Sequence, residues 1–144
     1  MADDSVHIKY VSEWMKQASG LSPDQLAGLF EKVMTALWHR TYSALGDVTV
    51  AAIVDRVLYN ATEEYPVLGS LTLDTTGVNF TEFREHAGSV SNRYLREAIQ
   101  FVIVELLTVV GNLTAEILTP ALHSELSNVT RTDSPPKQSG EKKP

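Results

Sequence analysis

Residues 91–118 read SNRYLREAIQFVIVELLTVVGNLTAEIL, and this stretch decides the fold. The β-branched residues in its middle part would suit a strand as well as a helix. The polar positions that decide are Glu105, Thr108, Asn112 and Glu116 in its second half and Thr119 directly after it. At 100° per residue they fall within one arc of roughly 80°, whereas in a strand they would lie on both faces. The stretch is therefore predicted to be one long helix that begins near Ser91 or Asn92 and reaches about Leu118.

This helix is not expected to cross a membrane. Gln100, Glu105 and Asn112 interrupt its apolar run, which leaves fewer than the ~20 apolar residues needed to span a bilayer. Most of its circumference is nevertheless apolar, so it must be covered by helices of the same chain or by a second chain. We expect a symmetric homodimer with this helix at or near the two-fold axis. The alternative is a monomer in which the helix is the central post of a bundle.

A first helix is predicted from four apolar residues at helical spacing: Ile8, Val11, Met15 and Ala18. Gly20 is expected to end it. In this projection Tyr10 and Trp14 lie on the side opposite Ile8 and Met15. Two exposed aromatic side chains would form a surface for a protein partner. Alternatively, they pack under the C-terminal tail or against a second copy.

Two further helices follow. Ser22-Pro23-Asp24-Gln25 is a strong helix start, with Ser22 and Gln25 in a capping box, and Gly46 ends this helix after about Leu45. Asp47 or Thr49 is expected to cap the next helix. The buried face of that helix is predicted to hold Val50, Val54, Val57, Leu58 and Ala61.

The remaining elements complete a mainly α fold, a helical bundle of about five helices with one small inserted β-hairpin. The hairpin is expected at 71–80, around a Thr75-Thr76-Gly77 loop. Thr81 is expected to cap a short helix, and Thr119-Pro120 to begin the last one, which ends near Val129. Residues 1–129 are thus predicted to form a single helical domain. Residues 130–144 contain no large apolar residue and are expected to be a disordered tail.

Composition excludes several classes of function. The 144 residues carry 12 Lys and Arg against 18 Asp and Glu, a net charge of −6, which disfavours binding to a phosphate backbone. The absence of cysteine excludes disulfides, thiol catalysis and cysteine-ligated metals. The acidic N-terminus lacks the apolar stretch of a secretory signal. We therefore expect a cytoplasmic protein that does not bind nucleic acid.

No residue pattern predicts catalysis, a cofactor or a metal. The four histidines, His7, His39, His86 and His123, lie far apart in sequence, and none has a partner one helical turn away. An enzyme would need His39, His123 and acidic residues to converge in space. His39 projects onto the polar face of its helix with Thr35 and Ser43, so it is expected on the surface, as a candidate for partner contact.

The stripe Glu105, Thr108, Asn112 and Glu116 has three interpretations. It is the solvated edge of the long helix, a polar register across a dimer axis, or the border of a ligand pocket. We expect a non-enzymatic protein-interaction or regulatory module that acts as a homodimer, by fold-level analogy an accessory domain in signal transduction. The alternative is a sensor of a small metabolite or haem-type ligand, with a pocket between the second, third and long helices beside Glu105 and Asn112.

Overall fold

The structure, a computed structural model, describes residues 4–18, 20–74 and 77–132. Its elements, in chain order, are α1 (Asp4–Lys16), α2 (Pro23–Leu45), α3 (Asp47–Glu64), the 3-10 helix η1 (Pro66–Ser70), β1 (Thr72–Asp74), β2 (Gly77–Asn79), α4 (Thr81–Ala87), α5 (Asn92–Leu113) and α6 (Thr119–Thr132). The predicted mainly α bundle with one small inserted hairpin is confirmed.

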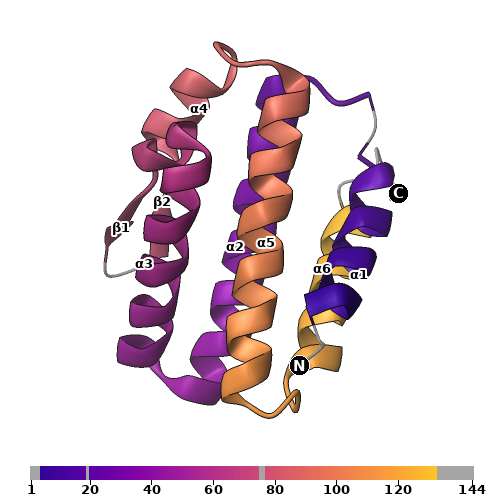
Figure 1. The fold of residues 1–144 in the computed structure, drawn as a ribbon, viewed down its shortest axis with the longest axis vertical. Helices are drawn as coiled ribbons and strands as arrows, with labels where there is room; N and C mark the ends of the chain where they lie inside the picture. The colour runs from indigo at the N-terminus through magenta and orange to yellow at the C-terminus, as the bar shows by residue number, and fades with distance from the viewer. Residues whose placement is uncertain (1–3, 19, 75–76, 133–144) are drawn as a thin grey trace, which may run out of the picture.

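The long helix α5 occupies the middle of the bundle (Figure 1). It packs against α1 on one side, α3 on the other and α2 behind, and α6 lies beside α1. Its inward face is completely buried and consists of Leu95, Ala98, Ile99, Val102, Ile103, Leu106, Leu107 and Val110. Burying each large aliphatic side chain of this face stabilises the fold by about 1.5–3 kcal/mol. Much of the helix is therefore covered within one chain, as in the central-post alternative, and only its outer side stays open.

Helix caps explain where α2 and α5 begin. The Ser22 hydroxyl accepts a hydrogen bond from the Gln25 N–H, and the Gln25 side chain accepts one from the Ser22 N–H, so the predicted capping box is confirmed. The Ser91 hydroxyl caps α5 in the same way by accepting from the Tyr94 N–H. The predicted cap of α3 is wrong, because its N-cap is Gly46, which makes no side-chain hydrogen bond.

The hairpin is confirmed, with a shorter loop than predicted. Leu73 pairs with Val78, and Asp74 pairs with Gly77, so Gly77 belongs to β2 and not to the loop. Thr75 and Thr76 lie outside the described residues. The predicted cap at Thr81 is also wrong, because Phe80 is the N-cap of α4 and the Thr81 N–H donates to the Asn79 side chain.

Helix α5 ends at Leu113, about one turn earlier than the predicted Leu118. The chain reverses there through Ala115 and Glu116, whose φ angles are +52° and +66°. The Glu116 N–H donates to the carbonyl of Gly111 at 2.7 Å, which closes the turn. Helix α6 then begins at Thr119 as predicted and continues to Thr132, into the segment expected to be a tail. The rest of that segment, 133–144, lies outside the described residues.

None of the helices among the described residues combines the length and the hydropathy needed to cross a bilayer.

Candidate functional site

The predicted polar stripe is only partly a stripe in the structure. Glu105 and Thr108 are half-buried and Asn112 is exposed, all on the outer side of α5. Glu116 does not belong to this face, because α5 has already ended and the reversed chain turns its carboxylate toward α1. The stripe therefore divides into an outer helix face and a separate polar cluster.

The outer side of α5 and the neighbouring face of α1 enclose a shallow groove of about 380 Å³ that is open to solvent. We call its lining the α5 face; it consists of Ile8, Tyr65, Glu97, Gln100, Phe101, Val104 and Glu105. Ile8 is 52% exposed, and Phe101 and Val104 are half-buried. The groove thus has an apolar centre with carboxylates among its lining residues.

Aromatic contacts fix the position of Tyr65 on the α5 face. The Tyr65 ring lies 5.6 Å from the Phe101 ring and 5.5 Å from the Tyr94 ring. Partial burial, followed by the nearby carboxylates of Glu97 and Glu64, raises the pKa of Tyr65 above its ordinary value of 10.0. Tyr65 is therefore a neutral phenol, and the centre of the face carries no charge from it.

Helix α1 is rotated relative to its predicted orientation. Its buried stripe contains His7, Val11, Trp14 and Ala18, and Ile8 points outward. Trp14 is only 3% exposed, so the prediction that it belongs to a partner surface is wrong. Met15, Val11 and Ala18 are buried as predicted, and His7, which the projection did not place, is buried with a polar partner on α6.

The two other surface candidates differ from each other. Tyr10 is half-buried, so it is not part of an open aromatic stripe; its hydroxyl donates to the carbonyl of His123 at 2.9 Å and also contacts the Ser127 hydroxyl. His39 is exposed on α2, as the helical projection predicts. Its role in contacting a partner stays a prediction.

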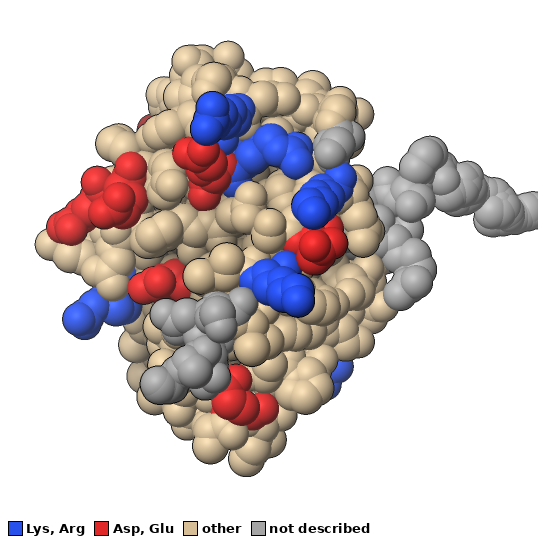
Figure 2. Space-filling model, turned by 45° about the vertical axis from the view of Figure 1, so that its right-hand side comes forward, with Lys and Arg blue, Asp and Glu red and all other residues tan. Residues whose placement is uncertain are grey.

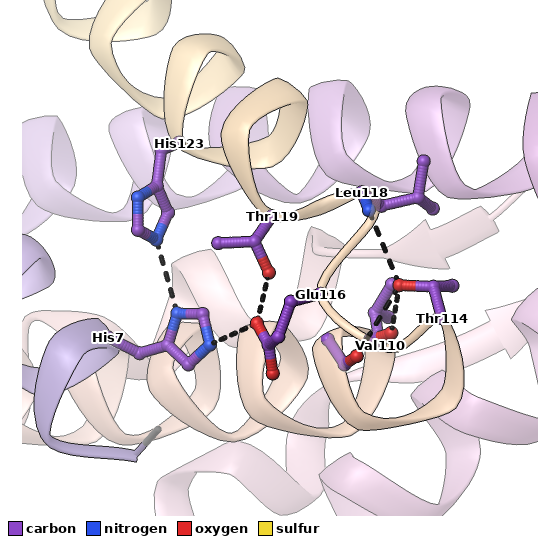
Figure 3. A network of polar contacts seen from close by, with 8 residues as sticks. His7, Val110, Thr114, Glu116, Leu118, Thr119 and His123 are labelled. Atoms are coloured by element: carbon purple, nitrogen blue, oxygen red, sulfur yellow. Dashed lines mark hydrogen bonds and ion pairs between the residues drawn. The ribbon is translucent and has the colours of Figure 1, made fainter. Parts of the chain in front are cut away.

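A partly buried polar cluster joins α1, the α5–α6 turn and α6 (Figure 3). Nδ1 of His7 lies 3.1 Å from Nε2 of His123, and Nε2 of His7 lies 3.7 Å from a carboxylate oxygen of Glu116. The same oxygen accepts a hydrogen bond from the Thr119 hydroxyl at 2.5 Å. We call His7, Glu116, Thr119 and His123 the histidine cluster. Its two histidines are 116 positions apart in the sequence.

The geometry of the cluster limits how many protons it can hold. Nδ1 of His7 and Nε2 of His123 share one hydrogen bond, so one of these nitrogens donates and the other accepts. Nε2 of His7 faces the Glu116 carboxylate at 3.7 Å, which is too long for a hydrogen bond. Burial, followed by the adjacent His7, lowers the pKa of His123 below 6.5, while Glu116 acts in the opposite direction. The hydrogen bond between the two rings therefore requires at least one imidazole to be neutral.

The turn that positions Glu116 is built for close approach. Ala115 and Glu116 both adopt the left-handed conformation, which is unfavourable for residues other than glycine. A Cβ at position 111 would lie 2.8 Å from a Glu116 carboxylate oxygen, so only glycine leaves room for the carboxylate as it stands. A glycine inside the predicted long helix is the sequence signal for this site, although alone it is weak.

Replacing Ala115 by glycine is expected to stabilise the protein by about 1 kcal/mol, because glycine adopts a positive φ without strain. Urea denaturation followed by circular dichroism measures the change. Ala52→Gly is the matched control: Ala52 is exposed in the middle of α3, where glycine should instead destabilise by about 0.5–1 kcal/mol. Equal losses in both variants would show that the turn is unstrained.

The cluster does not present the arrangement of a metal site. His7 offers different nitrogens to His123 and Glu116, so the three side chains do not converge on one point. Among the described residues no group of three or more histidine or carboxylate side chains is placed to hold a metal ion. His39 does not join this cluster, so the convergence that an enzyme would need, with His39 and His123 together, is not present in it.

The opposite end of α1 is also tied to α5. The Arg96 guanidinium donates hydrogen bonds to the carbonyls of Met15 and Ala18, each at 2.9 Å. These carbonyls belong to the C-terminal end of α1, where a cation is favourable. Helix α1 is therefore fixed by Arg96 at its C-terminal end and by the histidine cluster near its N-terminal end.

Arg96→Met is expected to lower the free energy of unfolding by about 2 kcal/mol, because two charge-assisted hydrogen bonds are lost while the apolar stem is kept. Arg93→Met is the matched control on the same helix. Arg93 is 89% exposed and, within the described part of the chain, pairs with Glu97, so its loss should cost less than about 0.5 kcal/mol. Urea denaturation compares the two; equal effects would contradict the role given to Arg96.

Comparison with models of known families, with curated proteins and with solved structures finds no match to this chain. Function is therefore inferred from the side chains described above.

Proposed function

We propose that the chain is a non-enzymatic protein-interaction module of a regulatory kind that pairs with a second copy of itself through the α5 face. The observation that carries this proposal is an apolar groove on the one open side of an otherwise buried central helix. Ile8 is 52% exposed there, beside the half-buried Phe101 and Val104. Such a surface resembles the apolar core of an interface more than it resembles the solvent-facing side of an ordinary helix.

A second copy fits this face because of its charge pattern. Figure 2 shows positive and negative side chains interspersed over this side of the molecule, with uncharged surface between them. Two identical surfaces related by a two-fold axis repel each other if they carry one sign of charge, and attract when both signs are present. Exposed Lys9 on α1 is next to Ile8, and Glu97 and Glu105 line the face from α5, so each copy can offer cations to the other's carboxylates.

The small-molecule sensor has less support. The side chains that α2, α3 and α5 turn toward one another are buried in a common core. Glu105 lines a groove on the outside, between α5 and α1, and Asn112 is not among the residues that line it. This groove is therefore not the interhelical pocket that was predicted beside Glu105 and Asn112.

Light scattering behind size exclusion, with native mass spectrometry of the same sample, tests the proposal. The expected result at micromolar concentration is twice the chain mass of 15.9 kDa, without an adduct. A monomer of 15.9 kDa would contradict pairing. A monomer that carries a bound small molecule would favour the sensor instead.

A further inference from the structure

We propose that the histidine cluster is a pH-responsive clamp that holds the first half of α1 against α6 and the α5–α6 turn at neutral pH and releases it in mild acid. The part of this inference that concerns pairing rests on the proposed function. Ile8 follows His7 directly and forms part of the α5 face, so release of α1 would also disturb that face.

The clamp follows from the number of protons that the cluster can hold. While at least one ring is neutral, Nδ1 of His7 and Nε2 of His123 can hydrogen bond across their 3.1 Å separation. When both rings are protonated, neither of these nitrogens can accept, so the hydrogen bond is lost. Two cations then lie with ring centres 5.3 Å apart. The Glu116 carboxylate, 3.7 Å from His7, cannot compensate both.

Among the described residues, the other groups around the two imidazoles do not supply a second negative charge to balance a second proton. Tyr10 of α1 stacks on the His123 ring at 4.1 Å and donates to its backbone carbonyl, so it supplies no negative charge. Glu125 of α6 is already paired with Arg40 of α2 at 2.9 Å. Thr119 and Ser127 are neutral. Among the described residues, Glu116 is thus the carboxylate that faces this pair, 3.7 Å from His7.

The direction of the pH effect follows from linkage. Burial and the neighbouring His7 lower the pKa of His123 in the folded protein below its ordinary 6.5. The unfolded chain therefore binds more protons just below that pH, and acidification favours opening. The stabilisation is complete above 6.5 and is lost progressively as the pH falls from 6.5 toward the lowered pKa of the folded state.

The first half of α1 should open before the rest. Arg96 holds only the Met15 and Ala18 carbonyls, at and just after the C-terminal end of this helix. The part-buried contacts of His7 and Tyr10 with α6 connect its first half. Local opening of a terminal helix with the core intact is a common low-energy event in small domains.

Hydrogen exchange at about pH 7.5 and about pH 5.5, with rates divided by the intrinsic rates of an unstructured chain, tests the clamp. In the wild type the protection of α1 amides is expected to fall at least tenfold in acid, while the protection of α2 and α5 stays constant. His123→Gln keeps an acceptor for His7 but has no titrating ring, so its α1 protection should be independent of pH. His39→Gln removes an exposed histidine and should behave as the wild type.

Solution mass measured on the same samples separates the clamp from the pairing. Loss of α1 protection together with loss of the dimer supports both. Loss of protection in a chain that is monomeric at both pH values supports the clamp and overturns the pairing. A dimer that persists while α1 opens overturns the link between them. If wild-type α1 protection does not depend on pH, the clamp is overturned whatever the mass, and this result needs no variant to fold.

Discussion

Replacing Val104 by glutamate is expected to convert the dimer into a monomer that is still folded. Val104 is half-buried at the centre of the α5 face, so a carboxylate there is solvated in the monomer but would be buried in the pair. A two-fold interface carries the substitution twice. At about 2 kcal/mol for each copy, the dissociation constant should rise by roughly a thousandfold.

Tyr59→Glu is the matched control for this variant. Tyr59 is 67% exposed on α3, in a separate groove next to Leu71 and Leu73, away from the α5 face. Sedimentation velocity over a range of concentrations should show the wild type and Tyr59→Glu as dimers and Val104→Glu as a monomer, all with the same circular dichroism. If Tyr59→Glu dissociates and Val104→Glu does not, the chain pairs through a different face.

Replacing His7 by alanine is expected to lower the free energy of unfolding by about 3 kcal/mol at neutral pH. His7 is 1% exposed, so its removal leaves a cavity, His123 loses its hydrogen-bond partner and Glu116 loses the imidazole that it faces at 3.7 Å. Glu116 is 38% exposed and can be rehydrated, which limits the loss. Urea denaturation at neutral pH measures the change.

His39→Ala provides the contrast between a buried and an exposed histidine. His39 is exposed on α2, and alanine is the better helix former, so the free energy of unfolding should change by less than about 0.5 kcal/mol. A large loss for His39→Ala, or a negligible one for His7→Ala, would mean that the histidine cluster does not hold α1 in place.

The parts of the fold that could be predicted are those in which local chemistry and periodicity agree. The side chains of the capping box at Ser22 and Gln25 satisfy specific backbone donors, and the box is present. In α5, the angular arc of Glu105, Thr108 and Asn112 marks the outer side of the helix, where Asn112 is exposed and the other two are half-buried. Periodicity therefore identified this element as a helix and also oriented it.

The orientation of α1 could not be predicted in the same way. The projection from Ile8, Val11, Met15 and Ala18 turns Ile8 inward and Trp14 outward. In the structure Nδ1 of His7 is hydrogen bonded to a residue 116 positions away, and Trp14 is buried while Ile8 is exposed. Contacts with a distant part of the chain, which periodicity does not show, thus accompany the observed orientation.

The α5–α6 turn was not predicted because the residues that form it are not types that usually end a helix. Neither Ala115 nor Glu116 is a residue that favours positive φ, and the apolar pattern continues through Ile117 and Leu118. The reversal brings Glu116 to His7 and allows Thr119 to donate to its carboxylate. A chain with the same helical periodicity and no such contacts would be expected to continue its helix.

Pairing through the α5 face can be tested directly, because the chain contains no cysteine and single cysteines can be introduced without background. Residues near a two-fold axis meet their own counterparts in the other copy. Under mild oxidation, Gln100→Cys, Val104→Cys and Thr108→Cys sample this axis along α5, with Tyr59→Cys as the control. The expected result is a disulfide-linked dimer of twice 15.9 kDa for at least one of the three, and a monomer for the control. Linkage of all three at or below the rate of the control would contradict the α5 face as the site of pairing.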